Sequence, residues 1–186
     1  MKDFLSGILI SLGAFIYLNV GGIVGAILFS FGIISIVKLN IRLYTGVAGT
    51  DIKFTDKCLV LVKNILGALF ASVFLYFISS DSVITTAQSI ALAKVSSSWY
   101  ITLIKAIFCG VIVDISVFLS KKENSVIPLL LGIPLFILSG FNHSIADVTY
   151  LILGATSEST SWNMFLYYII CIIGNYIGCN FRRNLT

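Results

Sequence analysis

One histidine, His143, stands in the run Ser-Gly-Phe-Asn-His-Ser-Ile-Ala-Asp at residues 139–147, inside an otherwise apolar segment. A neutral imidazole donates one hydrogen bond and accepts another, and it titrates near physiological pH, which suits a proton relay beside a weak acid. An ionisable group at membrane depth is costly and is by default functional. We therefore predict a proton-relay role. The alternative is a packing histidine whose hydrogen bonds are satisfied.

Few other charged side chains are placed to take part in such chemistry. Asp147 follows His143 by one helical turn, so it either faces the imidazole and holds its tautomer or lies among the outer headgroups. Lys94 either draws anions toward a pore or is a solvated loop lysine. Lys38 and Arg42 share a helix face, where they either line an inner vestibule or extend to the headgroups.

One further acidic residue and three aromatic residues also stand out in the sequence. Asp114 is interpreted as structural, paired with a lysine near the inner surface. Phe29, Tyr44 and Phe136 are candidates for a hydrophobic constriction that blocks hydrated ions, although each taken alone is as well explained by packing or lipid contact.

The amino-acid composition indicates that these residues belong to a membrane protein. Apolar residues make up 58% of the 186 positions, charged residues only 11%, and the mean hydropathy is +1.04. A soluble domain of this size has no means of burying so much apolar surface, which excludes an ordinary soluble enzyme, a disordered chain and a nucleic-acid-binding module. No nucleotide-binding loop, zinc motif or catalytic triad is present, and the 4 cysteines form no CxxC pair. We expect no enzyme activity, no cofactor and no metal.

A helical crossing of the roughly 30 Å hydrocarbon core takes about 20 residues, and six apolar segments meet this need. Their approximate bounds are Phe4–Val20, from Ile23 onward, Leu59–Ser79, Trp99–Ser120, from Val126 to Leu153, and Trp162–Phe181. A less hydrophobic stretch, Ser80–Ser98, separates the two halves of the chain. A loop, Gly154–Ser161, precedes the last apolar segment. The sequence predicts one transmembrane domain over residues 1–186, with halves at about 1–80 and 95–186.

Basic residues indicate the orientation, because lysine and arginine stay on the cytoplasmic side. Six spans place Lys94 alone on one side. The other side holds Lys2, Lys53, Lys57, Lys121, Lys122, Arg182 and Arg183. We expect a multi-pass protein of the cell membrane with both termini in the cytoplasm.

The second and fifth segments are interrupted, at Thr45-Gly46 and at residues 140–143. A helix breaks at membrane depth only where protein or a watery cavity satisfies the freed backbone groups, and free N–H groups there favour an anion. The alternative for the second segment is a helix that ends at Val37. The third and sixth segments both carry Asn-x-x-Gly, at Asn64 and Asn175. Halves of three spans with a broken middle helix are typical of an inverted repeat.

The run at residues 139–147 resembles the fifth span of the formate/nitrite transporter family. Supporting similarities, in the same order as in the family, are Leu-Tyr-Thr-Gly at 43–46, Lys-Ala-Ile-Phe-Cys-Gly at 105–110 and Gly-Asn-Tyr-Ile-Gly at 174–178. The resemblance implies an all-α, aquaporin-like protein of six transmembrane helices, repeated three plus three, with spans 2 and 5 broken. It also implies a homopentamer in which each protomer has its own pore.

By position, the resemblance makes His143 the pore histidine, Thr45 the threonine facing it and Lys94 the outer vestibule lysine. It implies constriction positions at Phe29, Ile33, Leu43, Tyr44 and Phe136, and supporting positions at Asn142, Ser144, Asp147 and Asn175. Asn142 and Asp147 invert the acid and the amide that flank the family's histidine.

The sequence thus favours a channel or proton-coupled carrier in the lipid bilayer, for small monovalent anions such as formate, nitrite or hydrosulfide or their conjugate acids. Two other classes stay open. One is a substrate-binding membrane subunit of a multi-component vitamin importer, and the other is a pore for neutral solutes. No nucleic-acid partner is expected.

Overall fold

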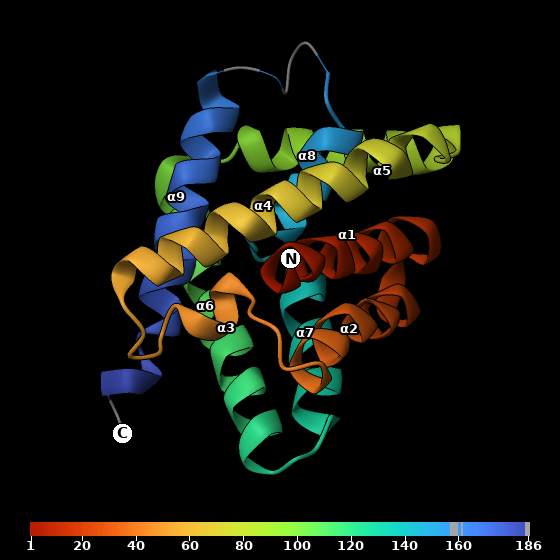
Figure 1. Cartoon of the computed structure of the whole chain (residues 1–186). Helices are drawn as coiled ribbons and strands as arrows, with labels where there is room; N and C mark the ends of the chain where they lie inside the picture. The colour runs from red at the N-terminus through yellow and green to blue at the C-terminus, as the bar shows by residue number, and fades with distance from the viewer. Residues whose placement is uncertain (157–159, 161, 185–186) are drawn as a thin grey trace.

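The computed structural model describes residues 1–156, 160 and 162–184, and within these ranges every regular element is a helix (Figure 1). The first half of the chain forms four helices: α1 (Lys2–Val20), α2 (Gly22–Lys38), α3 (Tyr44–Val47) and α4 (Phe54–Phe77). Gly21 and Gly22 join α1 to α2 with φ angles of 67° and 54°, a region that glycine enters without steric cost.

The second half begins with a helix at the position where the sequence indicated only a less hydrophobic connecting stretch. Helix α5 (Asp81–Val95) buries one side chain per turn, at Val83, Ala87, Ala91 and Val95. Asp81 in its first turn and Lys94 in its last turn also have the charges that stabilise the two ends of a helix. This alternation of small apolar and polar residues makes a surface helix, although it lacks the hydropathy of a membrane span.

The remaining elements are α6 (Trp99–Lys122), α7 (Ile127–Leu138), α8 (Ala146–Leu153), α9 (Trp162–Cys179) and a 3₁₀ turn (Arg182–Asn184). The connection expected at residues 154–161 and the end of the domain at residue 186 fall partly outside the described residues.

Four of the described helices, α1, α4, α6 and α9, are long and apolar enough to cross a membrane, whereas α2 and α7 are apolar but shorter. The sequence predicts six spans, the second and fifth of them broken, and this prediction is confirmed only in part. Helices α2 and α7 are short because each ends early, and a non-helical segment and a second short helix follow each of them.

Helices α2 and α7 end in the same way. Asn40 (φ 51°) and Gly140 (φ 64°) adopt the left-handed conformation. In α2, the Ile41 N–H donates to the Ile36 carbonyl and the Asn40 N–H to the Val37 carbonyl, both at 3.1 Å. In α7, the Phe141 N–H donates to the Phe136 carbonyl at 3.1 Å and the Gly140 N–H to the Ile137 carbonyl at 3.0 Å. This pair of bonds is the Schellman motif. The first break thus lies at residues 39–43, earlier than expected, and Thr45 belongs to the helical turn beyond it.

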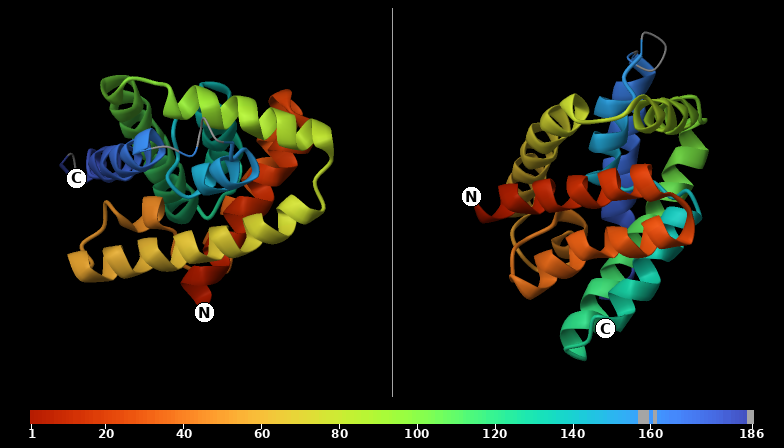
Figure 2. Two further views of the ribbon diagram at one scale, coloured as in Figure 1. Left: turned by 90° about the horizontal axis from the view of Figure 1, so that it is seen from above. Right: turned by 90° about the vertical axis from the view of Figure 1, so that its right-hand side faces the viewer.

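Helix α1 packs between α2 and α4, while α6 packs between α7 and α9, and α2 contacts α7 across the middle. Figure 2 shows α1 and α2 running side by side across the molecule. The short helix α3 packs on α6 of the opposite half, and α8 packs on α1 and α4. Each half therefore inserts its short helix against the long helices of the other.

Glycines bring the long helices into direct contact. Gly7 lies against the Asn64 carbonyl and Gly67 against the Phe4 carbonyl where α1 meets α4. Gly110 and Gly178 make the equivalent contacts where α6 meets α9. A Cβ at any of the four would overlap main-chain atoms, so only glycine fits, as expected for helices that pack through small residues.

Candidate pore site

His143 lies where the two non-helical segments meet, and only 1% of it is exposed. Its Nε2 atom is 3.0 Å from the hydroxyl oxygen of Thr45. Its Nδ1 atom accepts the main-chain N–H groups of Ile145 (3.3 Å) and Ala146 (3.2 Å). A nitrogen that accepts two N–H groups carries a lone pair, so the proton of the neutral ring resides on Nε2 and is donated to Thr45.

Asp147 does not hold the histidine tautomer, because main-chain groups do so, and it does not lie among headgroups. Its carboxylate is buried and accepts hydrogen bonds from the ammonium of Lys94 at 2.9 Å and from the hydroxyl of Tyr167 at 2.5 Å. A buried carboxylate needs such partners, because the charge is otherwise strongly disfavoured in a low-dielectric interior.

Lys94 is not a solvated loop lysine. It lies in the last turn of α5, its side chain is 12% exposed, and its ammonium also donates to the amide oxygen of Asn142 at 2.9 Å. The amide and the acid that appear in inverted order in the sequence therefore both contact the same lysine. Because the Asp147 carboxylate offsets the charge of the Lys94 ammonium, the ion pair of these two residues has no net charge.

Two cavities are lined by residues next to this centre. The first, of about 110 Å³, is lined by Lys94, Asp147 and Phe136, together with Tyr17, Ile90, Ile137, Gly140, Phe141, Ala146 and Tyr150. The second, of about 10 Å³, is lined by Ile33 and Leu43, together with Ile36, Val37, Ile41, Gly46, Val47, Val117 and Lys121. We call them the outer cavity and the inner cavity.

Aromatic rings pack at this centre. Phe136 stacks on the imidazole of His143 with ring centroids 5.5 Å apart, and the rings of Phe29 and Phe136 meet edge to face with centroids 6.0 Å apart. Phe29 is 0% exposed, and Ile33 and Leu43 are also buried. Tyr44 is directed elsewhere, because its hydroxyl reaches the Ile172 carbonyl of α9 at 3.4 Å. Four of the five residues expected at the constriction are thus buried at the centre or line a cavity beside it, whereas the Tyr44 hydroxyl bonds to α9.

Asn64 and Asn175 hold the two non-helical segments. The Asn64 amide oxygen accepts the Tyr44 N–H at 2.8 Å, and its NH₂ group donates to the carbonyls of Asp3 (2.7 Å) and Arg42 (3.2 Å). The Asn175 oxygen accepts the Ser144 N–H at 2.8 Å, and its NH₂ group donates to the carbonyls of Ala106 (2.9 Å) and Asn142 (2.8 Å). Ser144 therefore contributes through its main chain.

The ion pairs of Asp114 and Arg42 differ from the sequence expectations, whereas the exposed position of Lys38 fits either of its two alternatives. Asp114 pairs with Arg182 at 2.7 Å rather than with a lysine. Arg42 pairs with Asp3 at 2.7 Å, so its charge is satisfied by α1. Lys38 is exposed and donates to Asn124 at 3.1 Å. Arg42 and Arg182 each follow the end of a helical run and reach back to a buried acid, a pairing between distant segments that spacing in the sequence does not reveal.

Sequence reasoning also missed Tyr167 and Cys171. Both lie on α9 with buried side chains aimed at Asp147, the cysteine sulfur at 3.7 Å from the carboxylate. No motif marks them, because their role depends on the rotation of α9 against α8.

The apolar helices and this centre define a polytopic helical membrane protein with a buried histidine. Residues 1–182 match the family model described as formate/nitrite transporter, and the chain belongs to this family. Among curated proteins it is 28% identical to the uncharacterized transporter YrhG of Bacillus subtilis strain 168, over 94% of this chain and 78% of that protein. It is 24% identical to the formate channel FocA of Haemophilus influenzae, over 71% of this chain but only 54% of that one.

Solved structures share the fold. A chain described as an FNT family ion channel superposes with a TM-score of 0.85 at 17% identity, covering 99% of this chain and 86% of that one. A pentameric formate channel with formate bound gives a TM-score of 0.80 at 19% identity, covering 100% and 93%.

Proposed function

We propose that this protein is a membrane channel or proton-coupled carrier for small monovalent anions and their conjugate weak acids, of the formate, nitrite or hydrosulfide type. The hydrogen bond between His143 and Thr45 carries the proposal, because it joins a buried group able to relay protons to the short helix that follows the break after α2. Membership in the formate/nitrite transporter family supports the substrate class.

The proposal includes a single domain of six membrane crossings arranged as an inverted repeat, with α2–α3 and α7–α8 as broken crossings. The matched Schellman motifs at Asn40 and Gly140 support this repeat, and so do the matched hydrogen bonds of Asn64 and Asn175. Assembly as a homopentamer is supported by the similarity to a solved formate channel described as pentameric. The distribution of basic residues favours the cell membrane with both termini in the cytoplasm.

In the proposed mechanism the anion enters the outer cavity, where the Lys94 ammonium and the Asn142 amide are within hydrogen-bonding distance of each other. Because Asp147 already offsets the charge of Lys94, the lysine positions the anion at short range rather than attracting it from afar. An anion cannot enter the ring contact of Phe29 and Phe136 without losing its hydration, which is costly. A protonated, neutral acid crosses at far lower cost.

His143 serves the crossing as a hydrogen-bond donor and proton relay. In the neutral tautomer its Nε2–H is bonded to Thr45, and a passing acid can accept that hydrogen bond in place of the threonine. The ring is fixed by the two main-chain bonds to Nδ1, so Nε2 keeps its direction as the acid passes. The proton itself comes from solvent and leaves with the acid, which dissociates again on the far side.

Uptake of formate, nitrite and hydrosulfide into proteoliposomes at several pH values tests the proposal. We expect saturable uptake that rises as external pH falls and that drops at least tenfold in His143→Ala. Lys53→Ala, which removes an exposed lysine, is the matched control for purification and reconstitution. If both His143→Ala and Lys94→Ala retain wild-type flux and pH dependence, the mechanism is wrong.

A further inference from the structure

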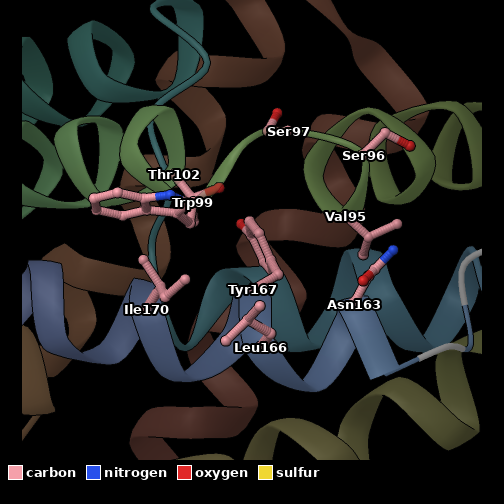
Figure 3. Close-up of a pocket in the computed structure, with 9 residues that line it drawn as sticks. All are labelled: Val95, Ser96, Ser97, Trp99, Thr102, Asn163, Leu166, Tyr167 and Ile170. Carbon is pink, nitrogen blue, oxygen red and sulfur yellow. The ribbon is translucent and has the colours of Figure 1, made fainter.

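A third cavity, of about 240 Å³, lies beside the pore centre but is not part of it. Figure 3 shows it between the α5–α6 connection and the first turns of α9. Its lining consists of Val95, Ser96, Ser97, Trp99, Thr102, Asn163, Leu166, Tyr167 and Ile170. None of these residues lines the outer cavity. We call it the lateral cavity.

The walls of the lateral cavity suit water. The hydroxyl of Thr102 is buried, with 1% of the residue exposed, and it has no hydrogen-bond partner within the described part of the chain. Ser96, Ser97 and Asn163 add further polar groups, and Ser96 and Trp99 at its edge are exposed. A polar cavity of this size holds several water molecules, and a buried hydroxyl without a protein partner is normally satisfied by one.

Tyr167 connects this cavity to the outer cavity. Its side chain lines the lateral cavity, as Figure 3 shows, while its hydroxyl donates to the Asp147 carboxylate at 2.5 Å. Asp147 in turn lines the outer cavity beside Lys94. A single buried side chain therefore links the lining of the lateral cavity to a carboxylate in the outer cavity.

We propose that Thr102, Tyr167 and Asp147 form a side entrance for protons into the outer cavity, separate from the path of the anion. The inference rests on the proposed function. A hydronium ion in the water beside Thr102 gives a proton to the Tyr167 oxygen and becomes water, as the tyrosine gives its own hydroxyl proton to Asp147. Protonated Asp147 then passes that proton to the anion held at Lys94, forming the neutral acid, and returns to its ion pair. One proton moves from lateral water to the anion, and every protein group ends as it began.

The surroundings of Asp147 agree with this role. Within the described part of the chain, Lys94 from α5 and Tyr167 and Cys171 from α9 contact its carboxylate. Cys109 from α6, Tyr150 from α8 and Tyr168 from α9 lie close enough to sense its charge but make no hydrogen bond to it. Lys94 is the cation of this set, and it contacts the anion in the proposed mechanism. Tyr167 is the member of the set that also lines the lateral cavity.

Tyr167→Phe removes the hydroxyl and keeps the ring beneath the Lys94 ammonium. In proteoliposomes with an inward proton gradient, we expect net proton-driven formate uptake to fall at least tenfold. Exchange of labelled for unlabelled formate at equal pH should stay within about twofold of the wild-type rate. During exchange, each departing acid releases its proton in the outer cavity, and the next formate to enter can take up that proton. Thr102→Val, which replaces the hydroxyl by a methyl group of similar size, should lower the driven uptake in the same direction.

The matched control is Tyr168→Phe, which removes a hydroxyl from the same helix that donates to the Ser144 carbonyl rather than to Asp147. It should leave the ratio of driven uptake to exchange unchanged. The side entrance is ruled out if Tyr167→Phe retains driven uptake, or if uptake and exchange fall together, which indicates a purely structural tyrosine. Absence of formate exchange in the wild-type protein would instead remove the proposed function itself.

Discussion

Asn64 and Asn175 each fix a non-helical segment with one accepted and two donated hydrogen bonds, and the groups they bind correspond in the two halves of the chain. Both side chains are fully buried. Backbone groups freed by a helix break have no water to bind in an apolar interior, so each asparagine substitutes for the missing helical partners.

Replacing either asparagine by alanine is expected to destabilise the protein. Each change leaves a buried N–H and the carbonyl of a non-helical residue, Arg42 or Asn142, without this partner, and a buried unsatisfied group costs about 1–3 kcal/mol. The melting temperature in detergent should fall by roughly 2–12 °C, which differential scanning fluorimetry would measure. Asn19→Ala is the control, because Asn19 is exposed and bonds only within its own helix. Equal melting temperatures for Asn175→Ala and Asn19→Ala would contradict this assignment.

The pairing of Lys94 predicts how transport responds to salt. In Asp147→Asn the outer cavity gains a net positive charge, so we expect formate flux to become sensitive to ionic strength, whereas wild-type flux changes little. The exchange Asn142→Asp with Asp147→Asn restores an acid beside Lys94, because both positions lie 2.9 Å from its ammonium. The double variant should recover salt insensitivity. It should still lack driven uptake, since Tyr167 no longer contacts a carboxylate. Salt-sensitive flux in the double variant would refute the pairing argument.

The histidine tautomer is open to direct measurement. We expect nitrogen-15 solid-state NMR of labelled protein in lipid to show a protonated Nε2 and an unprotonated Nδ1, since Nδ1 accepts two main-chain N–H groups. Thr45→Val removes the acceptor of the Nε2 proton and should lower formate exchange severalfold, while Thr45→Ser retains it. A protonated Nδ1 in the spectrum would show that the hydrogen-bonding scheme at His143 is wrong.

The glycines at the helix contacts lead to a further prediction, which concerns the stability of the folded protein. Gly178→Ala places a methyl group on the Ile107 carbonyl and should reduce the yield of folded protein and its melting temperature. Gly46→Ala is the comparison, because the nearest atoms to its new methyl group are those of Val117, at 3.7 Å. Size-exclusion profiles and melting curves of the two variants should differ clearly, and identical profiles would argue against close packing at Gly178.

Much of this arrangement could be predicted from local sequence. The helical character follows from hydropathy, and the break at residues 139–143 follows from Ser-Gly-Phe-Asn-His within an apolar run. The break after α2 was placed too late, because Asn40 is less obvious than glycine as a residue with positive φ. The role of His143 in transport stays a prediction, although the structure brings it to Thr45.

Partners that depend on helix rotation could not be predicted. Nothing in the spacing of Asp147 and Tyr167 shows that α9 turns its hydroxyl toward α8, or that Arg182 rather than a lysine reaches Asp114. Such pairings are decided by which faces of the helices meet. Helix α5 was missed for a related reason: its stability comes from the neighbours that cover one side of it, which hydropathy alone does not reveal.

The glycine contacts also bear on how the pore can move. At the four glycines where α1 meets α4 and α6 meets α9, main chain rests on main chain, so the helices cannot slide there through a change of side-chain rotamer. The two helix pairs form a stiff frame, and its bore is set when the chain folds. We expect any opening and closing to involve the rings of Phe29 and Phe136 and the segments at 39–43 and 139–145 rather than these helix contacts. Such a frame permits passage without the large swings of a rocking carrier.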